Sequence, residues 1–261
     1  EGGGIAKNSG AQVRLVQGSF GQITAAQILP VINPDDVHRA RTRLVSLENT
    51  CNRGGGSCYN LAEIAKIRSL CDAHGLGLHL DGARLMNAIV ANQENPKDYG
   101  KMFHSISLCL SKGLGAPVGS VLLGDAAFIK QARRVRKVMG GGMRQAGYLA
   151  AAGLFAMEHN INRLAEDHAH AKLLASALVS CNWIGEIFPV ETNIVIFEVL
   201  GNGDSAAGIS SSLKTAPEII AALLSQNIRV SAMSPTHIRM VTHLGVTPEM
   251  IHRTVEVLKG L

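Results

Sequence analysis

The sequence predicts an α/β protein with a mostly parallel sheet, followed by a smaller α+β domain. Between residues 43 and 123, short apolar runs of strand length alternate with segments that carry a helical stripe. This order is typical of strand–helix–strand units, in which helices cover the faces of a parallel sheet. After the glycines at 140–142 the pattern changes to long helical segments rich in Ala and Leu, which indicates a second, smaller domain.

The first domain is expected to open with a buried strand at 43–47 (RLVSL), followed by a helix at 61–74. This helix carries apolar residues at 61, 64, 67, 70 and 71, which form one helical face, and it ends near Gly75. The remaining elements, in chain order, are a strand at 77–80, a helix at 83–91 and strands at 105–110 and 120–123.

The second domain is expected to contain two long helices before its strands. These helices span 145–159 and 163–179; strands follow at 193–199, 228–231 and 238–241, with a helix at 216–226. We place the domain boundary inside the first long helix, near Met157. This divides the chain into a large domain at 1–157 and a small domain at 158–261.

The composition excludes several classes of protein. The chain has 261 residues, 46 % hydrophobic and 17 % charged, so it can build a sizeable core and is not a disordered chain. Its longest apolar stretch, 146–157, is shorter than the roughly 18 residues that a membrane span requires. The five cysteines form no CxxC pair, and their odd number argues against a disulfide framework. We therefore expect a soluble cytoplasmic protein with no membrane partner.

A basic segment between Lys130 and Arg144 holds six cations and no acidic residue. Because no aromatic residues interleave with these cations, we expect no nucleic-acid partner. An anionic small molecule or a cofactor phosphate is the better partner for this segment. The alternative is a basic helix face that is simply solvated.

Asp81 and Lys112 are the candidate reactive residues, since each follows a predicted strand. Ligands of open α/β sheets bind beyond the carboxyl ends of the strands, and the two positions are about one strand–helix–strand unit apart. A lysine that forms a Schiff base and an acid that keeps a pyridine nitrogen protonated are what pyridoxal 5′-phosphate (PLP) requires. Glycines at 113, 115 and 119 allow a tight turn beside a bulky ring. The alternative is that Asp81 caps the next helix and that Lys112 is an exposed lysine on a glycine-rich turn.

Other candidate motifs in the sequence lead to no site. His168 and His170 are two residues apart on a predicted helix, and residues at this spacing point to different faces. We therefore expect no metal site. The sequence also contains neither a GxSxG elbow nor a GxxxxGK phosphate loop.

Five segments, in order along the chain, resemble the low-specificity threonine aldolases. They are LVSLENTCNRGGGS (44–57), HLDGARLMNA (79–88), LCLSKGLGAPVGSVLLG (108–124), RKVMGGGMRQAGYLAAAGL (136–154) and IRMVTHLGVT (238–247). The resemblance covers essentially the whole chain, and five ordered segments are far more specific than any one of them. It implies a PLP enzyme with the aspartate-aminotransferase fold (fold type I), related to the β-eliminating lyases.

The resemblance also implies a role for individual residues. Lys112 matches the Schiff-base lysine, and Asp81 matches the acid on the pyridine nitrogen. Arg84 matches the arginine near the phenolic oxygen of the cofactor and the substrate carboxylate, and Arg239 matches the arginine that grips the α-carboxylate. A guanidinium fork suits such bidentate binding. Two further matches, Lys137 and Arg144, resemble family residues near the site and the subunit interface, and their roles carry over less directly.

The activity implied by the resemblance is the retro-aldol cleavage of L-threonine or L-allo-threonine to glycine and acetaldehyde. A PLP-dependent β-eliminating lyase acting on another β-substituted amino acid is the alternative enzyme. A catalytically silent fold that only associates with partners is the alternative of a different class. The family also implies a homo-oligomer, either a dimer or a tetramer, whose active sites draw on neighbouring subunits.

The sequence departs from the family pattern at two places. Cys51 stands where the family motif ENTHN has a histidine beside the substrate. A thiol is a poorer partner for the β-hydroxyl than an imidazole, although a small buried cysteine with no role is the alternative. The chain also begins at Glu1 without Met, where relatives carry several dozen further residues, including their phosphate-binding helix start. We therefore expect it to be part of a longer protein.

Overall fold

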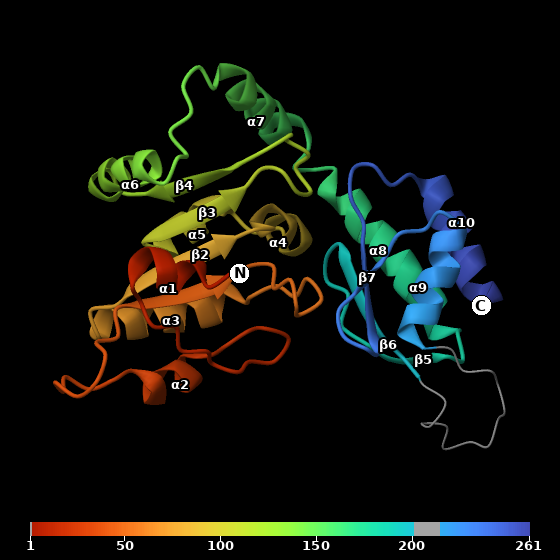
Figure 1. Ribbon diagram of the computed structural model, residues 1–261, viewed down its shortest axis with the longest axis horizontal. Helices are drawn as coiled ribbons and strands as arrows, with labels where there is room; N and C mark the ends of the chain where they lie inside the picture. Colours follow the sequence, from red (N-terminus) through yellow and green to blue (C-terminus); the bar gives the residue numbers. More distant parts are fainter. Residues whose placement is uncertain (1, 201–214) are drawn as a thin grey trace.

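The computed structural model describes residues 2–200 and 215–261, which form two sheets, each with its own helices (Figure 1). The first sheet has the strand order β1-β2-β3-β4, and the second has the order β5-β6-β8-β7. In Figure 1 the first sheet lies on the left and the second on the right. The α/β fold class predicted from the sequence is confirmed.

The first sheet is parallel except at one edge. Its strands are β1 (Leu44–Glu48), β2 (Gly77–Gly82), β3 (Ser105–Cys109) and β4 (Ser120–Gly124). The pairs β1–β2 and β2–β3 are parallel, whereas β4 runs antiparallel to β3. The parallel strands therefore end at one edge of the sheet, where Glu48 pairs with Asp81 and Asp81 pairs with Ser107.

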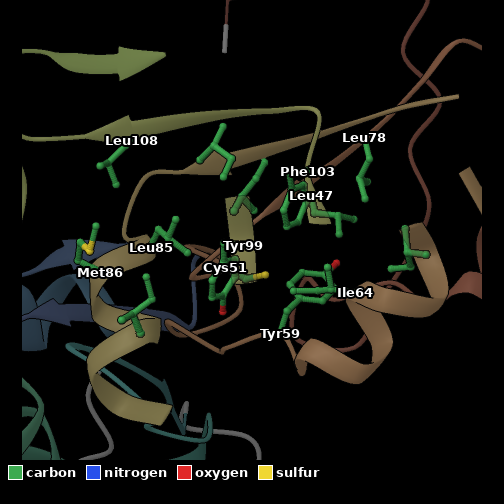
Figure 2. Packing of buried hydrophobic residues seen from close by; sticks show 14 of the residues in the cluster. Leu47, Cys51, Tyr59, Ile64, Leu78, Leu85, Met86, Tyr99, Phe103 and Leu108 are labelled. Carbon is green, nitrogen blue, oxygen red and sulfur yellow. The ribbon is translucent and has the colours of Figure 1, made fainter. Parts of the chain in front are cut away.

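One face of this sheet is apolar and covered by helices. Side chains alternate between the two faces of a strand, and Leu78 and Leu80 of β2 are fully buried on the covered face. The covering helices are α3 (Leu61–Ala73), α4 (Leu85–Asn92) and α5 (Pro96–Met102). Figure 2 shows how their side chains, among them Ile64, Leu85 and Tyr99, pack into this core.

The other face of the sheet is polar. On β2 it presents His79, which is half-buried, and Asp81, which is exposed. The Nδ1 atom of His79 lies 2.8 Å from Oγ of Ser105 on β3, at hydrogen-bond distance. Buried and more exposed side chains alternate strictly along β2, because only one face of the sheet contributes to the core.

The second sheet is antiparallel throughout its described pairs. Its strands are β5 (Ile184–Ile187), β6 (Ile194–Val199), β7 (Ser231–Ala232) and β8 (His237–Val241). The helices α8 (Leu164–Val179), α9 (Ala216–Ser225) and α10 (Pro248–Gly260) pack with it around a second buried cluster. Phe197 and Ile238, from neighbouring strands, lie at 0 % exposure in this cluster.

The remaining helices lie at the periphery. Near the start of the chain they are α1 (Gly4–Ser9), α2 (Ala25–Ile28) and the short 3₁₀ helix η1 (Leu29–Val31). Two longer helices, α6 (Ala126–Val138) and α7 (Gly147–His159), follow β4 and leave large apolar side chains such as Val138 and Tyr148 exposed. None of the helices in the described ranges is long and apolar enough to cross a membrane.

The strand predicted at 228–231 is largely wrong. Only Ser231–Ala232 forms a strand, β7. Asn227 adopts a left-handed conformation with φ of 62°, and the backbone N–H of Ile228 donates to the carbonyl of Leu223. Residues 228–230 are therefore the exit from α9 rather than part of the sheet. The division of the chain into domains at residue 157 stays a prediction.

A tight loop at residues 51–58 connects the first sheet to the segment before β6. Oγ1 of Thr192 donates to the carbonyl of Gly56 at 2.7 Å, and the backbone N–H of Cys58 donates to the Glu191 carboxylate at 3.0 Å. Gly56 has φ of 77°, and a Cβ added there would lie 2.5 Å from Oγ1 of Thr192. Both the backbone conformation and the close approach therefore require glycine.

We predict that Gly56→Ala destabilises the protein by about 2–4 kcal/mol, the sum of a left-handed backbone penalty and local overpacking. Urea unfolding followed by circular dichroism measures this loss. Gly100→Ala is the matched control, because Gly100 lies in α5 with no atom within 4 Å of an added Cβ, and alanine favours helices. Equal unfolding midpoints for the two variants would contradict the prediction.

Candidate active site

Polar side chains gather at the carboxyl edge of the first sheet. Glu48 ends β1, Asp81 pairs with it from β2, and Lys112 lies in the turn after β3. Asp81, Arg84 and Lys112 all lie close enough to act electrostatically on Glu48. The structure thus brings Asp81 and Lys112 to one edge, as the strand-end argument expects.

The pKa of Glu48 is affected by all three of these charged residues. Burial raises the pKa of its carboxyl, and the nearby negative charge of Asp81 raises it further. The backbone N–H of Asn52 and the cations Arg84 and Lys112 lower it, without cancelling the effect of burial. Glu48 is therefore a second carboxylate of the site, which the sequence interpretation did not assign. Its position at a strand end, next to Asp81 in the register, is the signal that identifies it.

The turn that carries Lys112 is held by its own backbone. The N–H of Gly115 donates to the carbonyl of Lys112 at 2.9 Å, and Gly115 has φ of 76°. Gly113 is buried, and a Cβ there would lie 2.9 Å from a methyl group of Leu164. These glycines let the chain turn tightly and leave the Lys112 side chain exposed at the sheet edge.

Arg84 enters the site from the beginning of α4. It is the N-cap residue of α4, while Asp81 still belongs to β2, so the alternative interpretation of Asp81 as a helix cap is wrong. The strand runs two residues further than expected, which leaves the Asp81 carboxylate free of a capping role. Nη1 of Arg84 donates to Oδ1 of Asn52 at 3.4 Å.

Arg239 reaches the same asparagine from the second sheet. It lies in β8, and its Nη1 donates to Oδ1 of Asn52 at 2.8 Å. Its Nε is buried without a hydrogen-bond partner among the described residues. Burial lowers the pKa of Arg84, and the charge of Arg239 lowers it further, so the two guanidinium groups are close together. Paired cations with a spare donor are suited to bind a carboxylate.

Cys51 is buried rather than exposed to the site. It has 1 % exposure, lies in the core cluster shown in Figure 2, and its thiol donates to the carbonyl of Glu48 at 3.1 Å. Burial raises the pKa of the thiol to about 12. Cys51 therefore stays a neutral thiol at physiological pH, which favours the interpretation of a small packing residue.

Lys137 and Arg144 lie apart from the residues described above. Lys137 is in the last turn of α6 and Arg144 follows that helix, and both are exposed. Within residues 2–200 and 215–261, neither is among the charges that act on Glu48 or Arg84. Their assignment to the site stays a prediction. The basic segment comprises the second half of α6 and the exposed residues that follow it, and the partner of this segment stays a prediction.

Among the described residues, no group of three or more His, Cys, Asp and Glu side chains is arranged to hold a metal ion. His168 and His170 are both buried on α8. Nε2 of His168 lies 3.2 Å from the side-chain amide of Asn87 on α4, and burial lowers the pKa of this imidazole. His168 thus packs between α8 and α4 as a neutral polar group.

Known proteins share both the sequence pattern and the fold. The chain is 38 % identical over 231 residues to the low-specificity L-threonine aldolase of Escherichia coli K12, covering 88 % of this chain and 64 % of that protein. It is 41 % identical over 206 residues to a probable low-specificity L-threonine aldolase 2 of Arabidopsis thaliana, covering 76 % and 57 % of the two chains. The chain thus spans less than two thirds of the length of these relatives.

The solved structure of a threonine aldolase from Leishmania major superposes with a TM-score of 0.78 at 22 % identity, covering 98 % of this chain and 72 % of that one. The fold and the polar sheet edge define an α/β protein of the fold type I class, to which threonine aldolases and aminotransferases belong. The sequence profile of the beta-eliminating lyase family matches residues 1–201. The chain belongs to this family, as the resemblance in the sequence implies.

We predict that Cys51 reacts with iodoacetamide at least about a hundredfold more slowly than Cys109 in the folded protein, because a buried neutral thiol is a poor nucleophile. Cys109 is partly exposed. Peptide mass mapping over time separates the two sites, and both should react fully after unfolding in urea. Labelling of Cys51 as fast as Cys109 would contradict its burial.

The native protein should lose stability as pH rises and Glu48 ionises, and we predict that Glu48→Gln removes this loss. A carboxyl whose pKa is raised on folding contributes stability below its unfolded pKa, near 4.5, and this contribution disappears as pH rises through the folded pKa. The stability of the variant relative to the native protein should therefore increase as pH rises from 4.5 and then level off. Urea midpoints for both proteins at several pH values measure this difference, in which the other titrating groups cancel. A difference that shrinks with rising pH would contradict the raised pKa.

Proposed function

We propose that the protein catalyses the PLP-dependent cleavage of L-threonine or L-allo-threonine to glycine and acetaldehyde, a carbon–carbon lyase reaction. The observation that carries the proposal is the gathering of Lys112, Asp81 and the paired arginines 84 and 239 around one sheet edge. The relatives of 38–41 % identity, which are named as threonine aldolases, support the same activity. A cytoplasmic location is part of the same proposal.

The side chains present fit PLP. The amine of Lys112 is exposed at the sheet edge, where it can bond an aldehyde, and the Asp81 carboxylate is exposed on the polar face of the same edge. Lys112, Asp81 and Arg84 are the residues that we propose to hold the cofactor. Bound there, PLP supplies an electron-withdrawing ring that stabilises a carbanion at the substrate Cα.

The residues of the chain have separate roles in binding the substrate and in proton transfer. Arg84 and Arg239 bind and orient the α-carboxylate of the amino acid, to which Nε of Arg239, without a partner among the described residues, can donate. With PLP bound, the Asp81 carboxylate would keep the ring nitrogen protonated, and the amine of Lys112 would move the proton at the substrate Cα. The Cys51 thiol does not remove the β-hydroxyl proton, because its pKa of about 12 keeps it protonated.

A PLP-dependent β-eliminating lyase is the second candidate, favoured by the name of the matching family and by Cys51 in place of the expected histidine. The products separate the two reactions. An aldolase releases an aldehyde and glycine, whereas a β-eliminating lyase releases ammonia and a keto acid. A silent fold would bind no PLP at all.

Assembly into a homo-oligomer, as a dimer or tetramer, is also part of the proposal. The exposed apolar side chains of α6 and α7 support it: Val138 is 88 % exposed and Tyr148 is 93 % exposed. Large apolar patches on a surface are typical of protein–protein contacts. Lys137 and Arg144 flank these residues, in agreement with a place near a subunit interface.

We predict that borohydride reduction of the PLP-loaded protein adds one PLP-sized increment to the intact mass and that peptide mapping finds it on Lys112. Lys112→Ala should lose this increment and lower the rate of threonine cleavage by a factor of about a thousand or more, since it removes both covalent and proton-transfer catalysis.

Lys97→Ala is the matched control, because Lys97 is an exposed lysine of α5, one of the helices on the covered face of the sheet and not on the polar edge. It should keep both the increment and the activity. The absence of any increment in the native protein, or an increment on another lysine, would overturn the proposal.

A further inference from the structure

Asn52 occupies a special position between the two sheets. Its Oδ1 accepts hydrogen bonds from Nη1 of Arg84 at 3.4 Å and from Nη1 of Arg239 at 2.8 Å. One of these arginines belongs to the beginning of α4 and the other to β8. A single acceptor therefore sets the positions of two cations that the chain brings together from widely separated segments.

Asn52 is itself held in place by its backbone. Its backbone N–H lies close enough to the Glu48 carboxyl, at the end of β1, to lower the pKa of that group. The loop that begins beside it closes through hydrogen bonds from the N–H of Cys51 to the carbonyl of Ser57 at 3.0 Å and from the N–H of Gly56 to the carbonyl of Cys51 at 2.9 Å. Asn52 thus belongs to a loop closed by backbone hydrogen bonds, and both arginine side chains donate to its side chain.

The acceptor at this position is a neutral amide. An aspartate of nearly the same shape would hold the two guanidinium groups equally well, but it would also neutralise one of their charges and compete with an incoming anion. The amide aligns the arginines without adding a negative charge of its own, and neither guanidinium forms a salt bridge within residues 2–200 and 215–261. The buried Nε of Arg239, which has no partner among the described residues, is the donor that remains for such an anion.

We propose that Asn52 is a positioning residue that aligns Arg84 and Arg239 for the substrate carboxylate and, being neutral, keeps their charge available to it. This inference deepens the proposed function and rests on it for the identity of the substrate, an α-amino acid. Because the amide leaves the charge of both arginines available, the site favours a ligand that carries a carboxylate. A purely structural contact between the two sheets would need only the acceptor oxygen and not its neutrality.

The test compares Asn52→Asp with the native protein, both loaded with PLP. Aspartate keeps the acceptor oxygen, so the thermal unfolding midpoint should stay the same or rise. The affinity for glycine, measured by isothermal titration calorimetry, should fall by about 10- to 100-fold, the contribution of hydrogen bonds to a charged group. KM for L-threonine should rise by a similar factor with a smaller change in kcat, and the PLP increment after borohydride reduction should be retained.

Asn182→Asp is the matched control, because Asn182 is an exposed turn residue before β5 and the substitution adds the same charge. It should leave glycine affinity unchanged. If Asn52→Asp binds glycine as tightly as the native protein, the inference is overturned, and the same holds if the native protein does not bind glycine. A third outcome separates the inference from the proposed function. If the native protein binds glycine, the Asn52→Asp variant does not bind it, and neither protein cleaves threonine, then the inference stands and the proposed aldolase reaction fails.

Discussion

The parallel register of β1, β2 and β3 is the constraint on which the rest of the structure depends. It places the ends of three strands along one edge, so that Glu48 lies beside Asp81 and the turn with Lys112 follows from the neighbouring strand. The register is itself determined by burial, because a shift by one residue would turn Leu78 and Leu80 out of the core and bring Asp81 into it. Core packing and the composition of the site are therefore coupled.

The second sheet completes the edge through one short loop. Residues 51–58 leave β1, contact Thr192 and Glu191 before β6, and carry Asn52, which both arginines contact. The loop is closed by its own backbone hydrogen bonds, and it contacts both the segment before β6 and Arg239 of β8. It therefore links the first sheet to the second. The carboxylate-binding geometry proposed for Arg84 and Arg239 thus depends on the packing of two separate cores against one another.

Much of this arrangement follows from local pattern. The helix at Leu61–Ala73 and the strands around Leu80 and Ile106 obey simple periodicity, and the strand-end rule correctly predicts that Asp81 and Lys112 lie at one edge of the sheet. The strand expected at 228–231 is wrong, because apolar residues that leave a helix look like a short strand until the turn at Asn227 is known. The sequence interpretation assigned neither Glu48 nor Asn52 a role, since a glutamate or an asparagine carries no local signal that distinguishes the positions we propose for them from those of surface side chains.

The sequence by itself determined the α/β class, the order of most elements and the family, because these depend on periodicity and on ordered motifs that are properties of the chain. Only the tertiary structure decided that β4 runs antiparallel, that Cys51 is buried and that Arg84 and Arg239 share Asn52. The physical reason is that burial and hydrogen-bond partnership depend on residues far apart in the chain. Arg239 lies in a strand of a different sheet from β1, and no local pattern specifies which loop that strand will meet.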